Sequence, residues 1–337
     1  MDTKKFIIIF LGILCLFFMV PVYQNPTSHI AGEYERFVAT YDRPYRYNPE
    51  EYQTRFLVFE KSMVRLKTMN ESVWRYSGAA TYGVTNFTDL SVEEFKRNHL
   101  ATYKQNSVKN VNVKSKIRRE DLPRSWDWRS KGFVTTVKDQ GVCGACWAYS
   151  VLGVVETMVA KANGRMAHDL SMQQIFDCIG DRNLGCKGGD FVELLEFLID
   201  ENISLQEERF YRTSPLGNCS RSGKLGNRVK EFRCGNFVDN EDEILNLLAN
   251  HGPLVAAING LTWQNYLSGV IQHHCDGDMT ELNHVVEIVG YNLTHEIPHY
   301  IVRNSWGKRF GENGYLRIAI GKNLCGIAQR VAAIFIE

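Results

Sequence analysis

Residues 140–147 constrain this chain more than any other segment, because they place two cysteines in front of a run with helical periodicity. The apolar residues of that run recur at spacings that put them on one side of a buried helix: Trp147, Val151, Val154, Val155 and Met158. Cys146 is therefore expected at the N-terminus of this helix. There the unpaired backbone N–H groups and the positive end of the helix dipole favour a thiolate, which is the form that a nucleophile requires.

Two other interpretations of Cys143 and Cys146 are a redox pair and half of a zinc site. A zinc site normally needs a second such pair, which the sequence does not contain. A redox pair needs a thioredoxin-like β-α-β context, and the glycine-containing loop before Cys143 does not supply one. We therefore favour the nucleophile and expect neither a metal nor a cofactor.

Residues 140–147 read Gln-Gly-Val-Cys-Gly-Ala-Cys-Trp and resemble the active-site signature of the papain-like cysteine peptidases. The resemblance extends from about Ala31 to the C-terminus and rests on several separate motifs. It implies that Cys146 is the nucleophile and that the side-chain amide of Gln140 joins the backbone N–H of Cys146 in an oxyanion hole. One such donor typically lowers the barrier by about 2.7–4 kcal/mol.

The resemblance also assigns the imidazole and its partner. His284 lies 138 residues after Cys146, inside the interval of about 130–150 residues that is typical of the family. Without the resemblance it would be an ordinary core histidine in a strand. Asn304, in an Arg-Asn-Ser-Trp-Gly segment, would hold the imidazole toward the thiolate, with Trp306 shielding that hydrogen bond from water. By itself Asn304 would be interpreted as a turn residue.

Five further residues match the substrate-binding cleft of the family. Gly188 and Gly189 match the edge on which these enzymes hydrogen-bond an extended substrate, since glycine permits close approach of the backbone. Phe191 and Val285 match walls of the pocket for the second residue before the scissile bond, so an apolar side chain is expected there. Arg330 matches the far end of that pocket. One hypothesis is that Arg330 admits acidic side chains; we favour the alternative, an ordinary surface arginine.

The chain has nine cysteines, and an odd number leaves at least one unpaired. Cys15 is expected to leave with a signal peptide, Cys146 to stay reduced, and Cys234 to be a buried, inert thiol. For Cys234 a second nucleophile or an intermolecular bridge are the alternatives. Sequence alone allows 15 pairings of the remaining six cysteines. The family resemblance implies three disulfides: Cys143–Cys186, Cys178–Cys219 and Cys275–Cys325.

The N-terminus predicts the compartment. Lys4 and Lys5 precede an apolar run, residues 6–20, in the pattern of a secretory signal peptide. A membrane anchor is the alternative, but the run is shorter than the roughly 20 residues needed to span a bilayer. We therefore predict a signal peptide at residues 1–20, no permanent membrane anchor, and a lysosomal or secreted protein. Five N-glycosylation sequons are compatible with that route: Asn70, Asn86, Asn202, Asn218 and Asn292.

Residues 21–121 are predicted to be a helical, inhibitory propeptide. Steps of three and four residues place one set of side chains on a single helical face: Glu51, Arg55, Phe59, Ser62, Leu66 and Asn70. Glu51 and Arg55 are a predicted ion pair. Residues 83–89 are interpreted as a strand that enters a turn, and Ser91 with Glu94 predicts a capping box for another helix.

Residues 103–121 are basic and lack apolar periodicity, which indicates an exposed linker accessible to proteases. A nucleic-acid-binding segment is the weaker alternative, because the whole chain carries a formal net charge of only +1. We therefore expect no nucleic-acid partner.

The family resemblance implies an α+β protein with a papain-like two-lobed fold. A helical lobe at residues 122–230 would carry the nucleophile, and a β-barrel lobe at residues 231–337 would carry the histidine and the asparagine. The chain would be a monomeric cysteine endopeptidase made as a zymogen, with its own propeptide as inhibitor. It would cleave protein and peptide substrates through a thiolate–imidazolium pair, with a strongly lowered thiol pKa, and an acyl-enzyme.

Two further considerations bear on this prediction. Residues 190–218 contain no histidine, so the histidine-bearing insertion that makes one branch of the family a dipeptidase is absent, and an open cleft is expected. The alternative from another class is a non-catalytic, secreted binding or storage protein with the same fold.

Overall fold

The computed structural model describes residues 26–73, 77–101, 118–182, 185–211, 219–221 and 228–337. By compactness the chain divides into two units, residues 1–63 and 64–337. The predicted signal peptide and most of the predicted linker lie outside the described residues. Among the residues that are described, no helix is both long enough and apolar enough to cross a membrane.

The first unit consists of two helical segments and one 3-10 turn: α2 (Pro26–Thr40), η1 (Pro44–Tyr47) and the N-terminal part of α3 (Pro49–Val73). Its core is aromatic. The ring of Tyr34 lies 4.9 Å from that of Tyr52 and 5.3 Å from that of Phe59, between centroids. The predicted ion pair is confirmed, with Arg55 Nε 2.6 Å from Glu51 Oε1. The α3 helix therefore forms where the periodicity predicted it.

The second unit begins with the C-terminal part of α3, followed by β1 (Thr81–Tyr82) and α4 (Val92–His99). The predicted capping box is confirmed. The Ser91 hydroxyl accepts a hydrogen bond from the backbone N–H of Glu94 at 3.1 Å, and the Glu94 carboxylate accepts one from the backbone N–H of Ser91 at 2.9 Å. These two bonds satisfy backbone donors that the first turn of a helix leaves unpaired.

The predicted strand at residues 83–89 is wrong, because the strand ends at Tyr82 and a turn follows it. Threonine side chains hold the turn. Thr88 Oγ1 accepts from the backbone N–H of Thr85 at 2.8 Å and donates to the Thr85 carbonyl at 2.9 Å. Local side-chain bonds of this kind compete with a strand for the same backbone groups.

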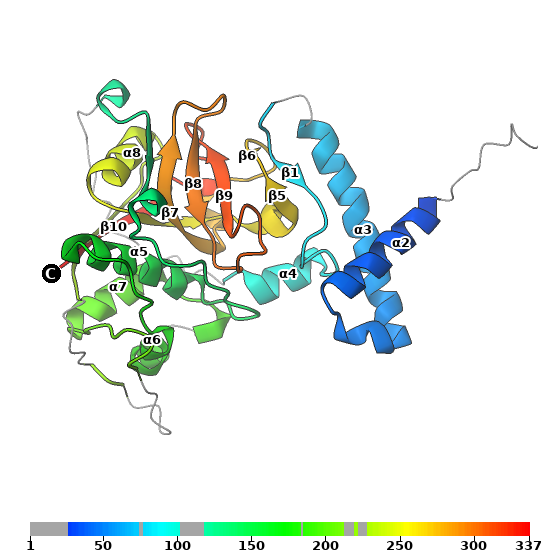
Figure 1. Cartoon of the computed structure of the whole chain (residues 1–337), viewed down its shortest axis with the longest axis horizontal. Coiled ribbons are helices and arrows are strands. Elements are labelled where there is room, and N and C mark those ends of the chain that lie inside the picture. The colour runs from blue at the N-terminus through cyan, green and yellow to red at the C-terminus, as the bar shows by residue number, and fades with distance from the viewer. Residues whose placement is uncertain (1–25, 74–76, 102–117, 183–184, 212–218, 222–227) are drawn as a thin grey trace, which may run out of the picture. The chain divides into compact units, whose positions relative to one another are not determined.

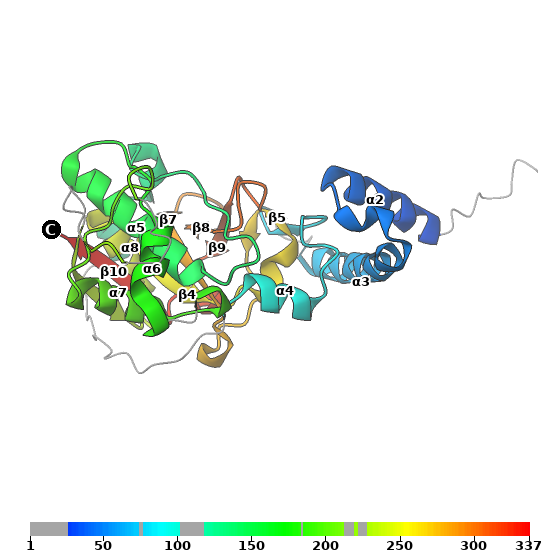
Figure 2. The ribbon, with the colours of Figure 1, turned by 90° about the horizontal axis from the view of Figure 1, so that it is seen from below.

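The helices between residues 118 and 211 include the one predicted after Cys146. They are η2 (Arg119–Asp121), η3 (Trp128–Lys131), α5 (Cys146–Asn163), α6 (Met172–Ile179), η4 (Gly180–Arg182), η5 (Gly185–Lys187) and α7 (Phe191–Asp200). Figure 1 shows α5, α6 and α7 gathered on one side of the strands, and Figure 2 shows the same grouping from below. The α5 helix packs against β7 and β10, and Cys146 lies near the backbone of Val285 at the start of β7.

The sheet of the second unit has eight strands in the order β3-β10-β4-β7-β8-β9-β6, with β2 paired to β7. All pairs are antiparallel except β6 with β9, and β1 pairs separately with β5. The strands are β2 (Ser125–Asp127), β3 (Val229–Gly235), β4 (Leu254–Ile258), β5 (Tyr266–Ser268), β6 (Val270–Ile271), β7 (His284–Asn292), β8 (His299–Arg303), β9 (Tyr315–Ala319) and β10 (Arg330–Ile336). The helices among them are α8 (Glu241–Asn250), η6 (Leu261–Asn265), η7 (Met279–Glu281) and η8 (Leu324–Gly326). The predicted α+β class is confirmed.

The pairing of β2 with β7 depends on one glycine. A Cβ atom on Gly290 would lie 2.2 Å from the backbone oxygen of Trp126, so a side chain there would push β2 off the sheet. The register of β7 against β8 also shifts between Ile288 and Gly290. The strand that begins with His284 is thus held on both sides.

The structure joins the three cysteine pairs that the family resemblance implied, Cys143–Cys186, Cys178–Cys219 and Cys275–Cys325. Cys146 and Cys234 are free and buried. Burial raises the pKa of the Cys234 thiol to about 12, so this thiol is neutral near pH 7. Within the described ranges, no cluster of three or more His, Cys, Asp or Glu side chains could hold a metal ion.

Candidate active site

Cys146 is the first residue of α5, as predicted, and its side chain is completely buried. Burial raises the pKa of the thiol to about 12, and hydrogen bonds with the backbone of Val285, of Trp147 and of Cys146 itself act in the opposite direction. The sequence predicted a lowered pKa instead. The direction differs because the folded chain buries the thiol completely and so removes the solvent that a thiolate needs.

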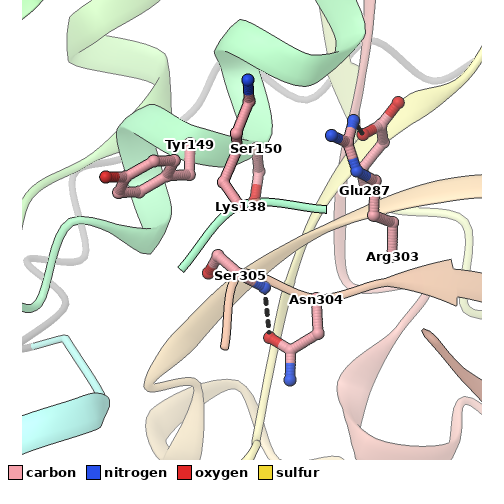
Figure 3. A pocket seen from close by; sticks show the side chains of 7 residues that line it. All are labelled: Lys138, Tyr149, Ser150, Glu287, Arg303, Asn304 and Ser305. Atoms are coloured by element: carbon pink, nitrogen blue, oxygen red, sulfur yellow. Dashed lines mark hydrogen bonds and ion pairs between the residues drawn. The ribbon is translucent and has the colours of Figure 1, made fainter. Parts of the chain in front are cut away.

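His284 and Asn304 lie next to each other, as the family resemblance implied. Nε2 of His284 is 2.8 Å from Oδ1 of Asn304, and that oxygen also accepts from the backbone N–H of Ser305 at 2.8 Å (Figure 3). The imidazole stacks on Trp306, with 4.7 Å between centroids. Burial lowers the pKa of His284 to about 4, against the effect of the Asn304 hydrogen bond. Because an amide oxygen only accepts, Nε2 carries the proton and Nδ1 is the basic nitrogen.

Gln140 binds a peptide carbonyl of the predicted propeptide. Its Nε2 donates to the backbone oxygen of His99 at 3.1 Å and to that of Cys143 at 2.7 Å. The Ser305 hydroxyl donates to Gln140 Oε1 at 2.6 Å, which fixes the orientation of the amide. The donor assigned to the oxyanion hole therefore already holds a carbonyl oxygen.

Residues 87–101, which we call the covering segment, lie over this site. The rings of Phe87 and Phe95 meet the Trp306 ring edge to face at 5.7 Å and 5.2 Å. Beyond α4 the backbone N–H of Ala101 donates to the carbonyl of Asn283 at 2.7 Å. The covering segment thus contacts Asn283, which precedes His284 in the chain, and Trp306, which stacks on the His284 imidazole.

A buried ion network lies behind the site and was missed by the sequence analysis. It consists of Glu287, Arg303, Thr135 and Glu156. Arg303 Nη1 is 2.9 Å from the Glu287 carboxylate, and Arg303 Nη2 donates to the Thr135 hydroxyl at 3.0 Å (Figure 3 shows the first two residues). Thr135 in turn donates to Glu156, which is fully buried and has its pKa raised to about 7 by burial.

The network links β7, which begins with His284, α5, which begins with Cys146, and β8, which ends one residue before Asn304. Gly153 on α5 makes room for it, because a Cβ atom there would lie 2.5 Å from a Glu287 oxygen. A signal was present in the sequence. Glu287 interrupts an apolar strand, and Glu156 interrupts a buried helix, and charged residues are buried only when they are paired.

The predicted cleft residues are all buried. Gly188 adopts a φ of +125°, and Phe191 and Val285 are inaccessible to solvent. Arg330 is only 4% exposed, so the favoured interpretation as a surface arginine is wrong. Its Nη2 lies 2.9 Å and 2.8 Å from the two carboxylate oxygens of Asp190, and its guanidinium covers the ring of Phe191 at 5.1 Å.

Two sequence profiles match this chain. That of the papain family cysteine proteases matches residues 122–335, and that of the cathepsin propeptide inhibitor domain (I29) matches residues 34–95. The first match covers more than half of the chain, so the chain belongs to the papain family of cysteine proteases. Its inhibitor domain makes it a zymogen. The predicted family, fold and enzyme class are confirmed.

Relatives and solved structures agree with this membership. Residues 263–275 resemble cathepsin O within the family, and cathepsin O from Homo sapiens is 37% identical over 282 residues, 82% of this chain and 87% of that protein. Cysteine proteinase 15A from Pisum sativum is 32% identical over 94% of this chain and 91% of its own. The digestive procathepsin L2 proteinase from Tenebrio molitor larval midgut has a TM-score of 0.78 at 29% identity, covering 91% of this chain and all of that one.

Proposed function

We propose that Cys146 is the nucleophile of this protease, that His284 is its acid–base partner, and that Asn304 orients the imidazole. Gln140 and the backbone N–H of Cys146 would form the oxyanion hole. One observation carries the proposal: the Gln140 amide donates to a peptide carbonyl, that of His99, at 3.1 Å. A substrate carbonyl bound in the same way would lie beside the N-terminus of α5.

The contacts support hydrolysis of a peptide bond through an acyl-enzyme. Asn304 holds the proton of Nε2, so Nδ1 takes the thiol proton, and the thiolate forms a bond to the carbonyl carbon. The negative charge that develops on the carbonyl oxygen is stabilised by the Gln140 amide and the Cys146 N–H. The C–N bond then breaks as Nδ1–H protonates the departing amine. Water attacks the acyl-enzyme with His284 as base, which releases the acid and restores the thiol.

The cleft residues support a substrate class for this reaction. Gly188 and Gly189 would hydrogen-bond the backbone of an extended peptide, and Phe191 with Val285 would contact an apolar side chain at the second position before the scissile bond. The charge of Arg330 is paired with Asp190, which favours an apolar over an acidic side chain there. The enzyme would act as an endopeptidase, because no histidine interrupts residues 190–218.

The proposal also includes the life cycle of the zymogen. Residues 1–20 would direct the chain into the secretory pathway, and cleavage within residues 103–121 would release a monomeric enzyme. The relative named cathepsin O and the three disulfides support a lysosomal or secreted location.

Labelling of the processed enzyme tests the catalytic assignment. The zymogen would be incubated at acidic pH with reductant and then treated with a thiol-directed epoxide. We expect label at Cys146 and cleavage of peptide substrates, no label in Cys146→Ala, and at least a tenfold lower kcat in Asn304→Ala. Asn250→Ala serves as the control, because Asn250 only donates an exposed hydrogen bond to Asn246, and this variant should keep full activity. A processed, folded enzyme that neither labels nor cleaves would instead support a non-catalytic protein with this fold.

A further inference from the structure

Two neighbouring amide side chains lie at the end of the 3-10 helix η6. Gln264 and Asn265 are each only 2% exposed. They follow Trp263, whose ring lies 6.2 Å from that of His284 and 6.5 Å from that of Trp306. We call these two residues the amide pair. The amide pair therefore directly follows Trp263, which lies beside the candidate catalytic histidine.

The amide pair uses all of its side-chain donors on the propeptide. Gln264 Nε2 donates to the backbone oxygens of Phe87 at 2.7 Å and Leu90 at 2.8 Å. Asn265 Nδ2 donates to the Gly83 oxygen at 3.1 Å, and it also donates to the Thr88 hydroxyl at 2.9 Å. Four acceptors within one turn of the propeptide are therefore bound by two side chains.

Both amide oxygens face one guanidinium. Nη2 of Arg65, on α3, donates to Gln264 Oε1 and to Asn265 Oδ1, each at 2.9 Å. Burial lowers the pKa of Arg65, partly offset by the charge of Glu93. A flipped amide would turn its N–H groups toward the guanidinium and its oxygen toward backbone carbonyls. Only one orientation of each amide therefore satisfies the whole set.

The backbone of the amide pair takes part as well. The Thr85 hydroxyl donates to the Gln264 carbonyl at 2.7 Å, and the backbone N–H of Gly83 donates to the Asn265 carbonyl at 2.9 Å. The complementarity is thus specific in chemistry: one guanidinium from a helix, and a turn whose carbonyls and hydroxyls point at two amides. A propeptide without an arginine at this place would leave two buried oxygens without a donor.

We propose that the amide pair is a recognition surface that makes this enzyme selective for its own propeptide, with Arg65 as the residue it reads. The surface lies outside the catalytic groups and would accept an I29-type propeptide that presents a guanidinium and a hydroxyl-bearing turn. The proposal rests on the proposed function in one respect: it takes the site that the propeptide covers to be the catalytic one.

The experiment measures how fast the intact zymogen opens. Full-length Arg65→Met zymogen is mixed with a small thiol-directed epoxide at neutral pH, and the rate of Cys146 labelling is compared with that of the wild type. We expect labelling to rise at least tenfold. Because Arg65 lies in the propeptide, the processed variant enzyme is chemically identical to the processed wild type, and its equal kcat/KM shows that the enzyme folded correctly. Lys67→Met, an exposed change on the same helix, is the control and should label at the wild-type rate.

A double-mutant cycle separates recognition from general weakening. Gln264→Met with Asn265→Leu should also raise the labelling rate, and adding Arg65→Met to that pair should raise it no further. Independent, multiplicative effects, or an unchanged rate in Arg65→Met, would overturn the proposal. Should Cys146 never label even in the processed wild-type enzyme, the proposed catalysis fails. The amide pair is then still tested in Cys146→Ala zymogens, by whether hydrogen exchange of residues 83–90 accelerates in Arg65→Met.

Discussion

Two regions that flank the candidate active site each bury a titratable group, and the two groups are of opposite type: one is a base and the other is an acid. On the cleft side the covering segment brings His99, a base, into a buried position beside Gln140. On the rear side the buried ion network encloses Glu156, an acid. Burial lowers the pKa of His99 and raises that of Glu156 to about 7. The same loss of solvent therefore makes the two sides respond to pH in opposite directions.

The covering segment and the buried ion network are therefore expected to differ in how their stability depends on pH. His99 in the closed zymogen resists protonation, so its contribution to closure is complete above the free histidine value near 6.5 and is lost as pH falls below it. Glu156 binds its proton more tightly in the folded protein than in the unfolded one. Its contribution to the free energy of unfolding is therefore complete below pH 4.5 and is lost as pH rises toward 7. Acid therefore weakens the cover and strengthens the core.

The largest effect is expected from breaking the rear side. Arg303→Met leaves the buried carboxylate of Glu287 without its partner, and removing one member of a buried pair typically costs about 3–5 kcal/mol. Urea unfolding of Cys146→Ala zymogens at pH 7 measures the loss. Arg317→Met is the matched control, because its pair with Glu312 is partly exposed and should matter by less than about 1 kcal/mol. Equal losses in both variants would contradict the importance of burial.

The next effect concerns the pH dependence of the rear side. Glu156→Gln keeps an oxygen for the Thr135 hydroxyl and the Leu170 N–H but has no proton to lose. A pKa raised from 4.5 to about 7 corresponds to about 3 kcal/mol between acidic and neutral pH. We expect the unfolding free energy to fall less between pH 5 and pH 7.5 in Glu156→Gln than in the wild type, because Asp190, whose pKa burial also raises to about 7, still titrates in the variant. An unchanged slope in the variant would show that another group titrates.

A smaller effect is expected on the cleft side. The His99 imidazole faces the Asp139 carboxylate and the Gly141 backbone, which both raise its pKa, and burial outweighs them; the His284 imidazole also faces it. Opening of the zymogen should accelerate as pH falls below 6.5, by at most tenfold per pH unit for one proton. His99→Leu should remove that acceleration. Epoxide labelling between pH 7.5 and 5 measures it, and an identical profile in His99→Leu would refute the assignment.

The smallest effect concerns the proposed substrate pocket, where Asp190 pairs with Arg330 and burial raises the pKa of the Asp190 carboxyl to about 7. Asp190→Asn keeps an oxygen for the backbone N–H of Val192, which caps α7, and removes the partner charge of Arg330. We expect the variant to gain about fivefold in relative kcat/KM for peptides with glutamate at the second position, the scale of one weak charge interaction. Profiling with a peptide library measures the ratio to leucine. No gain would mean that Arg330 does not reach the substrate.

Much of the chain could be predicted from local pattern. The helix after Cys146, the capping box of Ser91 and Glu94, and the Glu51–Arg55 pair all depend on residues within one or two turns of each other. The strand at residues 83–89 failed because threonine side chains took the backbone groups that a strand needs. The interpretation of Arg330 as a surface residue was wrong for a different reason, because its partner Asp190 lies 140 residues away in the chain.

The sequence by itself determined the class of chemistry, because a cysteine at a helix start, a histidine at family spacing and an asparagine in an Arg-Asn-Ser-Trp-Gly segment together resemble one family. Only the tertiary structure decided the state of those groups. Which carbonyl the Gln140 amide binds, which arginine contacts the amide pair, and in which direction each pKa moves all depend on contacts between residues far apart in the chain. Burial is a property of the folded molecule, and it is burial that makes the thiol neutral here and the rear carboxylates dependent on Arg303.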